Sequence, residues 1–223
     1  RIMVATGAAP RALPFAPFDH ERILSSQDAM VMPERPERLI IVGSGAIGME
    51  FAYFFNAMGT DVTVIEMLDR ILPVEDKEVS KEALKIFKKQ GITFKPGHMT
   101  TAIDRTDSGV SVTIANAKDE SKTEVLEGDA VLVAVGVSGR FDGLFGDGVD
   151  IDIDRGHIKV TYQGVDEPTY ETSLPGVYAI GDVIGPPWLA HVAGEEAVTC
   201  VERMAGHHTL GVDYNSIPGC TYT

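Results

Sequence analysis

The chain has 223 residues, 44% hydrophobic side chains and a formal net charge of −14. This length and apolar content are sufficient for one large or two modest packed domains. The acidic balance argues against nucleic acid and anionic membrane surfaces as partners, because both would repel the chain.

The first part of the chain predicts little regular structure. Arg1–Pro14 reads as a strand, a turn of small residues and a proline-rich connection. Ser25–Pro36 reads as a polar linker that contains a short helix. Because Arg1 to Val4 looks like the middle of a strand, we expect a fragment of a longer protein.

The segment Arg38–Glu66 has the pattern of a βαβ unit. An apolar strand at Leu39–Val42 precedes a glycine triad and an amphipathic helix, and Val62–Ile65 forms a second strand that closes on Glu66. Gly59 is the expected end of the helix.

The glycine triad predicts a dinucleotide-binding loop. Gly43 permits a tight turn, Gly45 lets a pyrophosphate approach the main chain, and Gly48 lets the helix pack closely on the strands. The helix start offers free N–H groups and the positive end of its dipole to the phosphates. A lone glycine turn could instead serve only helix packing. The flanking strand and helix, and an acid 23 positions after Gly43, favour the dinucleotide interpretation.

Glu66 indicates which dinucleotide is expected. A carboxylate at the end of the second strand can accept hydrogen bonds from both hydroxyls of an adenosine ribose and would repel a 2′-phosphate. The next residue is Met67, not an arginine that would accommodate this phosphate. The sequence therefore predicts NAD(H) rather than NADP(H).

The segment after Glu66 predicts the rest of an α/β domain. A helix over Lys77–Gln90 is capped by Asp76 and ended by Gly91, and Ile92–Phe94 forms a third strand. An antiparallel β-meander follows, with strands at Met99–Asp104, Val110–Ile114 and Lys122–Leu126. The apolar run Ala130–Val135 predicts a strand buried in a parallel sheet, and it ends on Gly136 at the carboxyl edge.

Beyond Gly136 the composition changes. Gly139–Asp154 is rich in glycine and aspartate and predicts a solvated connection between domains. Its acids lack the spacing of an EF-hand loop, so no calcium site is expected. Val177–Ile180 predicts a buried strand that leads into Gly181 and Asp182, and a helix follows from about Ala193 to Met204.

The cysteines and the apolar stretches bear on the compartment. Cys200 and Cys220 form neither a CxxC nor a metal-spaced cluster, which indicates a reducing compartment and thiols without a chemical role. No apolar stretch approaches the roughly 18 residues that span a bilayer, and no signal-like segment opens the chain. The expected location is therefore the cytoplasm, with no membrane partner.

The order of the motifs resembles that of the flavin-dependent pyridine nucleotide-disulfide oxidoreductases. The matching segments are ATG at Ala5–Gly7, GSGAIGME at Gly43–Glu50, VAVG at Val133–Gly136, YAIGDV at Tyr178–Val183 and LAH at Leu189–His191. The last two, followed by CVERMAG at Cys200–Gly206, are most similar to the branch of the family that oxidises dihydrolipoamide. The resemblance covers essentially the whole chain.

The resemblance implies an α/β fold with four parts. Residues 1–25 would be a segment of an FAD-binding domain, and residues 26–137 a Rossmann-like NAD-binding domain that includes the antiparallel β-meander. Residues 138–213 would be the second part of the Rossmann-like FAD-binding domain, and residues 214–223 the start of a dimerisation or interface domain. The family's first GxGxxG unit, its redox CxxxxC pair and its His–Glu base are not in this sequence, so we assign no catalytic residue.

The resemblance also assigns cofactor contacts residue by residue. Toward NAD they are the pyrophosphate loop Gly43, Ser44, Gly45, Ala46, Ile47 and Gly48, then Glu50 near the nicotinamide, Glu66 on the ribose, Thr100 beside the adenine and Gly136 on the nicotinamide side. Toward FAD they are Thr6, Gly7 and Ala8 near its ADP part, Asp182 at the ribityl or phosphate region, and Trp188, Leu189, Ala190 and His191 around the isoalloxazine. Glu50 could instead be an exposed helix acid and His191 a structural residue.

Some positions depart from the family pattern. Val137 and Val192 replace an arginine and a lysine that are frequent in the family, and Thr100 replaces an apolar residue. The segment Thr161–Ser173 is longer than usual. These departures concern the fine geometry and the substrate branch, not the fold.

The resemblance implies a function for the parent protein. It would be an NAD-dependent flavoprotein that oxidises dihydrolipoamide through a redox disulfide and FAD, acting as a homodimer with the lipoyl-bearing E2 subunit of 2-oxoacid dehydrogenase complexes. We expect this chain to be inactive alone. Two alternatives stay open. The chain could be a nucleotide-binding module without turnover, or it could belong to a relative such as an NADH oxidase, a mercuric or glutathione reductase, or a ferredoxin reductase.

Overall fold

The computed structural model describes residues 1–162 and 168–223, which form two compact units. Unit 1 consists of residues 1–9 and 137–219, and unit 2 of residues 10–136 and 220–223. Residues 163–167, which belong to the segment predicted to be longer than usual, lie outside the described residues.

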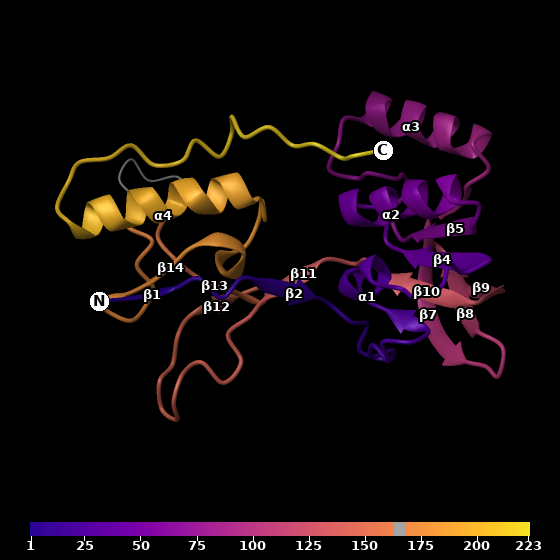
Figure 1. Cartoon of the computed structure of the whole chain (residues 1–223), viewed down its shortest axis with the longest axis horizontal. Coiled ribbons are helices and arrows are strands. Elements are labelled where there is room, and N and C mark those ends of the chain that lie inside the picture. Colours follow the sequence, from indigo (N-terminus) through magenta and orange to yellow (C-terminus); the bar gives the residue numbers. More distant parts are fainter. Residues whose placement is uncertain (163–167) are drawn as a thin grey trace. The chain divides into compact units, whose positions relative to one another are not determined.

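Unit 2 is built on a five-stranded parallel sheet (Figure 1). Across the sheet the strands are β3 (Ile23–Leu24), β10 (Ala130–Val133), β4 (Arg38–Val42), β5 (Asp61–Glu66) and β6 (Thr93–Pro96). The register places Val133 beside Val42, and Val42 beside Ile65. The carboxyl ends of β10, β4 and β5 therefore meet at one edge.

Local signals in the sequence mark several ends of the helices in unit 2. Ser25 and Asp28 form a capping box at the start of α1 (Ser26–Met30). The Asp76 side chain accepts a hydrogen bond from the Glu78 N–H at 2.7 Å at the start of α3 (Lys77–Lys89). After α2 (Ala46–Ala57) and α3 the chain turns through glycines with left-handed φ, Gly59 at 89° and Gly91 at 102°. The predicted cap and both glycine ends are confirmed.

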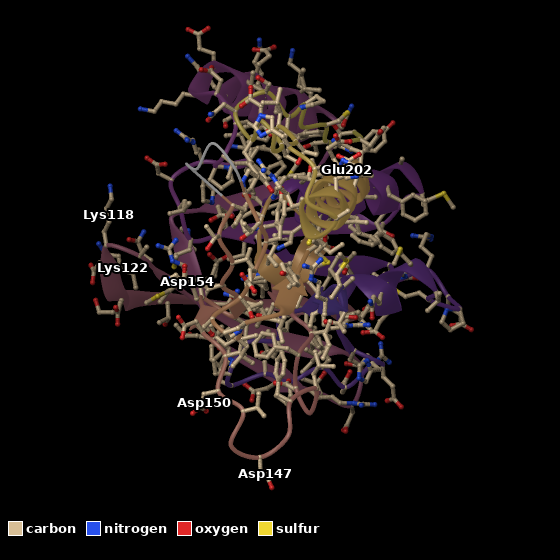
Figure 2. All side chains as sticks on the ribbon, turned by 90° about the vertical axis from the view of Figure 1, so that its left-hand side faces the viewer. Lys118, Lys122, Asp147, Asp150, Asp154 and Glu202 are labelled. Carbon is tan, nitrogen blue, oxygen red and sulfur yellow. The ribbon has the colours of Figure 1, made fainter. Side chains whose placement is uncertain are left out.

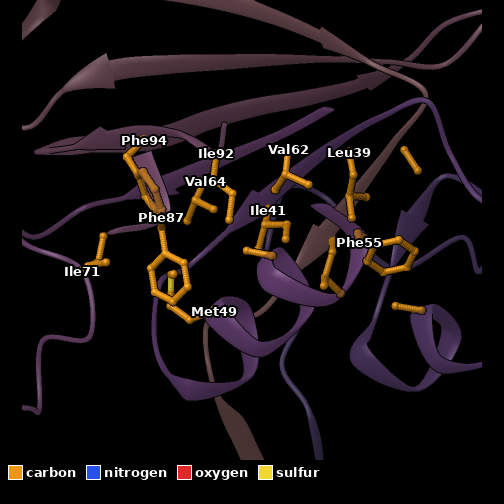
Figure 3. Packing of buried hydrophobic residues seen from close by; sticks show 14 of the residues in the cluster. Leu39, Ile41, Met49, Phe55, Val62, Val64, Ile71, Phe87, Ile92 and Phe94 are labelled. Carbon is orange, nitrogen blue, oxygen red and sulfur yellow. The ribbon is translucent and has the colours of Figure 1, made fainter. Parts of the chain in front are cut away.

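The sheet lies between the helices on one face and an antiparallel meander on the other. The meander contains β7 (His98–Arg105), β8 (Val110–Asn116) and β9 (Asp119–Gly128). The three predicted strands are confirmed, but β9 extends beyond the predicted Lys122–Leu126 at both ends. Successive side chains of a strand point to opposite faces, so Leu39 and Ile41 pack with the helices (Figure 3). Ile40 and Val42 pack with meander residues. Apolar residues on both faces explain why β4 is continuously apolar after its first residue.

Details of the sheet differ from the prediction, among them the bounds of β6, which runs from Thr93 to Pro96 where Ile92–Phe94 was predicted. The strand β3 was not predicted, because two residues are too few to show a period, and its place depends on pairing with Val131 and Leu132. The strand β10 ends at Val133, two residues before the predicted Val135.

Unit 1 is assembled from segments that are far apart in the sequence. The strand β1 (Ile2–Val4) pairs in parallel with β14 (Val177–Ala179). Two small sheets accompany it, β2 (Ala8–Pro10) with β11 (Val137–Gly139) and β12 (Ile153–Asp154) with β13 (His157–Ile158). A 3₁₀ turn, η1 (Gly181–Ile184), leads on to the helix α4 (Ala190–Met204).

The start of α4 corrects a prediction. The helix begins at Ala190, three residues before the predicted Ala193. Its N-cap is Leu189, which provides no side-chain hydrogen bond, so the sequence carries no capping signal there. The residues Leu189–His191 therefore open the helix instead of preceding it.

The segment Gly139–Asp154 is more than a connection between domains. Phe141, Phe145 and Ile151 pack against the buried core of unit 1, so the segment belongs to that unit. Its aspartates are exposed, and Figure 2 shows Asp147 and Asp150 at the outer end of the loop.

No helix within residues 1–162 and 168–223 has the length and apolar character to cross a bilayer.

Candidate functional site

The carboxyl edge of the parallel sheet is where the candidate site lies. In the sheet, β5 and β6 lie on one side of β4, and β10 lies on its other side. Open α/β sheets bind ligands outside the carboxyl ends of their strands, where the direction of the strand order changes. In unit 2 this point is the end of β4, which continues into the glycine loop.

The three glycines of the loop face different surroundings. A Cβ at Gly43, whose φ is 101°, would lie 2.4 Å from the Ala134 carbonyl oxygen, and a Cβ at Gly48 would lie 2.0 Å from the Gly43 carbonyl oxygen. A Cβ at Gly45 would meet nothing within 4 Å. Gly43 and Gly48 are thus required by close backbone packing, whereas Gly45 borders open space.

The start of α2 has hydrogen-bond donors available. Its N-cap is Gly45, with no side-chain cap, and its first turn holds no acidic residue. Ala46 and Ile47, the first two helical residues, are exposed. The first N–H groups of a helix have no partner within the helix, and the helix dipole places partial positive charge there. This start can bind an anion such as a pyrophosphate.

Glu66 points toward the glycine loop. Its Oε2 accepts hydrogen bonds from the Ser44 N–H at 2.9 Å and the Ser44 hydroxyl at 2.7 Å, and its Oε1 accepts one from the Leu68 N–H at 2.8 Å. The side chain is 9% exposed. The expected proximity of acid and glycine turn is confirmed. Ser44 was assigned to the cofactor, but its side chain is fully buried and donates to Glu66, a contact that the sequence analysis did not predict.

The remaining residues assigned to NAD lie around this edge or on the meander. Gly136 follows β10 with φ 113°, and its carbonyl accepts a hydrogen bond from the Arg11 N–H at 3.0 Å. Glu50 lies in α2, where its Oε1 accepts a hydrogen bond from the Tyr222 N–H at 3.0 Å. Thr100 lies at a register shift of β7, and its buried Oγ1 has no hydrogen-bond partner among the described residues.

Two of the stretches assigned to FAD lie together in unit 1. Because β1 and β14 are parallel neighbours, with Val4 beside Ala179, the residues that follow them share one edge. These are Thr6 to Ala8 on one side and Gly181 with Asp182 on the other. The Thr6 hydroxyl donates to the Arg140 carbonyl, and Gly7 has a left-handed φ of 75°.

The third stretch assigned to FAD, Trp188 to His191, runs into α4. Trp188 has a left-handed φ of 53° and is 40% exposed. Its indole N–H donates to Nε2 of His157 at 3.3 Å. Leu189 is the N-cap of α4, and His191 in the first turn is exposed. The contact with His157 could not be predicted, because the two residues lie 31 positions apart on different elements.

A buried acid holds the turn that carries Asp182. Glu196 is 3% exposed, and its Oε2 accepts a hydrogen bond from the Gly181 N–H at 2.7 Å. Its Oε1 accepts one from the Tyr214 hydroxyl at 2.7 Å. Burial raises the pKa of Glu196, although these two hydrogen bonds oppose the shift. Glu196 was missed, but its helical spacing with the buried Val192 and Cys200 is a signal that it lies on the inner face of α4.

The two cysteines are in different environments. Cys200 is fully buried, and burial raises the pKa of its thiol to about 11. A thiol with a raised pKa is a poor nucleophile at neutral pH. Cys220 is exposed. The burial of Cys200 is consistent with the expectation that its thiol has no chemical role.

The fold defines a class of protein. A parallel sheet with a glycine turn after its central strand, helices on one face and a meander on the other is an α/β fold of the Rossmann type. The chain belongs to the pyridine nucleotide-disulphide oxidoreductase family, whose model matches residues 1–197. Members of this family use NAD and FAD.

Curated relatives and solved structures are similar over nearly the whole chain. A dihydrolipoyl dehydrogenase of Chlorobaculum tepidum is 40% identical over 221 residues, which cover 99% of this chain and 45% of the relative. A dihydrolipoyl dehydrogenase of Corynebacterium glutamicum is 41% identical over 225 residues, which cover 99% of this chain and 46% of the relative. The crystal structure of LpdA from Mycobacterium tuberculosis has a TM-score of 0.85 and 30% identity over 99% of this chain and 46% of that one. The chain spans about half the length of the curated relatives it matches.

Proposed function

We propose that the chain forms the NAD-binding portion and part of the FAD-binding portion of a flavin-dependent dihydrolipoyl dehydrogenase. One observation carries the NAD assignment: an uncapped helix start and the open side of Gly45 lie beside a carboxylate held at the end of the next strand. The names of the 40% and 41% identical relatives support the assignment to this enzyme.

The residues around the glycine loop suit the parts of NAD. N–H groups at the start of α2 would bind the pyrophosphate, and Glu66 would accept a hydrogen bond from the adenosine ribose. The carboxylate would repel the 2′-phosphate of NADP. Gly136, at the end of the neighbouring strand β10, and Glu50 would lie toward the nicotinamide. Thr100 would lie beside the adenine.

Unit 1 has features that suit part of an FAD site. Thr6 to Ala8 and Asp182 follow adjacent parallel strands, and Glu196 fixes the turn in which Asp182 lies. Trp188 to His191 open α4, whose start has no side-chain cap. The chemistry that FAD supplies when bound is two-electron transfer between a redox disulfide and NAD⁺. The side chains proposed here bind and orient, and none is assigned a catalytic role.

The finer assignments rest on the family pattern. We propose an NAD-binding domain over residues 26–137, FAD-binding segments at 1–25 and 138–213, and the start of an interface domain at 214–223. The parent protein would be a cytoplasmic homodimer that acts on the lipoyl group of an E2 subunit.

A second candidate is a nucleotide-binding module without turnover. The observation that favours it is the uncapped start of α2 beside the open side of Gly45, which can bind a pyrophosphate whether or not turnover follows. A family member with another substrate, such as an NADH oxidase or a mercuric or glutathione reductase, would keep the same fold and nucleotide site.

The proposal is tested by titrating the purified chain with NADH and with NADPH and following the nucleotide fluorescence. Flavin absorbance measures the bound FAD, and a dihydrolipoamide assay measures turnover. We expect NADH to bind at least about tenfold more tightly than NADPH, a difference of about 1.4 kcal/mol. We also expect no turnover by the chain alone. Tighter binding of NADPH, or no binding of either nucleotide, would contradict the proposed NAD site. Stoichiometric FAD together with diaphorase activity would contradict the second candidate, a nucleotide-binding module without turnover.

A further inference from the structure

All three polar groups of Ser44 form hydrogen bonds with Glu66, the last residue of β5, or with the loop that follows this strand. Its N–H and its hydroxyl both donate to Oε2 of Glu66, at 2.9 and 2.7 Å, and its carbonyl accepts a hydrogen bond from the Leu72 N–H at 2.9 Å. The residue has no exposed surface. Ser44 therefore lies within the glycine loop without presenting its side chain to a ligand.

Glu66 has little freedom as a consequence. A carboxylate offers about four acceptor positions on its two oxygens. Two on Oε2 are used by Ser44, and one on Oε1 by the Leu68 N–H at 2.8 Å. About one position is left, on Oε1. All three contacts are hydrogen bonds to a carboxylate, which are stronger than bonds between neutral groups. The contact with the Ser44 hydroxyl is the shortest of the three, at 2.7 Å, and it is the one that a side-chain substitution can remove.

We propose that Ser44 is a specificity-determining residue that acts through Glu66. It fixes the carboxylate so that Oε1 presents its remaining acceptor position to one hydroxyl of the adenosine ribose. This inference rests on the proposed NAD site. It narrows the prediction made from the sequence, in which Glu66 accepts from both hydroxyls, to a single contact. Without the Ser44 hydroxyl, Oε2 keeps only one of its two hydrogen bonds, the carboxylate is held less firmly, and its contact with NADH is weakened.

A double-mutant cycle separates this positioning role from a merely structural one. The dissociation constants for NADH and NADPH are measured by fluorescence for the whole chain and for its S44A, E66A and S44A/E66A variants. We expect S44A to weaken NADH binding about tenfold and to leave NADPH binding unchanged, so that the preference falls about tenfold. In the E66A background, S44A should have no further effect on the preference.

Thr60 provides a matched control. It is 2% exposed, and its hydroxyl donates to the Pro36 carbonyl at 2.8 Å, just before β5 begins and therefore at the opposite edge of the sheet from Glu66. T60V removes a buried hydroxyl as S44A does, but it should leave the nucleotide preference unchanged. Should S44A fail to fold, S44C replaces the hydroxyl with a weak donor of similar size and should also lower the preference.

The outcomes are distinct. A preference that S44A leaves unchanged, or that falls by the same factor in the E66A background, overturns the inference while the proposed NAD site stands. Equal weakening of NADH and NADPH by S44A also overturns it, because this indicates a distorted loop and not a misplaced carboxylate. Failure of the unaltered chain to bind NADH overturns the proposed function and the inference together.

Discussion

Two glycines only three positions apart should respond in opposite ways to the same substitution. A Cβ at Gly45 meets nothing within 4 Å, and the φ of Gly45 is −67°, which alanine adopts readily. A Cβ at Gly48 lies 2.0 Å from the Gly43 carbonyl oxygen, about 1 Å inside the 3.0 Å limit that real Cβ atoms keep. G45A should therefore affect ligand binding, and G48A should affect folding.

The magnitudes follow from these surroundings. G45A loses a favourable N-cap glycine but also lowers the entropy of the unfolded chain, so its net effect on the free energy of unfolding should stay within about 1 kcal/mol. G48A forces a methyl group against backbone, which costs about 1–3 kcal/mol or more. At about 4 °C per kcal/mol, the Tm of G48A should fall by roughly 4–12 °C.

Thermal unfolding and NADH titration of both variants measure the two effects separately. We expect G45A to keep its Tm within about 4 °C and to bind NADH at least about tenfold more weakly, since its methyl group occupies the space where the pyrophosphate approaches. Unchanged NADH affinity in G45A would refute the assignment of the pyrophosphate to Gly45. A G48A variant as stable as the unaltered chain would refute the packing argument.

Three further predictions concern other parts of the chain. In the folded chain, iodoacetamide at pH 8 should modify the exposed Cys220 but not Cys200, whose thiol is buried and has a raised pKa. After unfolding, both cysteines should react. Modification of Cys200 in the folded state, detected by mass spectrometry, would contradict this. Because burial raises the pKa of Glu196, the stability it contributes is present below its usual pKa of 4.5 and is lost as the pH rises through the raised pKa. The Tm of the unaltered chain minus that of E196Q should thus fall as the pH is raised from 4.5, and a difference that stays constant or grows would contradict this. D76A removes the N-cap of α3 and should lower the free energy of unfolding by about 1 kcal/mol in urea; no change would argue against the cap.

Sequence reasoning succeeded where the determinants are local. The strand β4, the glycine turn and α2 follow from apolar periodicity and glycines within one short segment, and Asp76 and Gly91 mark the ends of α3. The family pattern also gave the order of the elements. These features need no knowledge of distant contacts.

The features that were missed depend on contacts between distant segments. The two-residue strand β3 exists because it pairs with β10, more than 100 positions later. The role of Ser44 requires Glu66, 22 positions later on another strand, and the contact of Trp188 with His157 spans 31 positions. The start of α4 was misplaced because Leu189 gives no capping signal.

A crystal structure of the chain with NADH would show whether the glycine loop and Glu66 bind the nucleotide together. We expect the pyrophosphate to lie against the N–H groups that follow Gly45. We also expect one ribose hydroxyl of the adenosine within about 3.2 Å of Oε1 of Glu66, with Ser44 still bonded to Oε2. An adenosine ribose bound away from Glu66, or a pyrophosphate that does not contact the start of α2, would contradict this expectation.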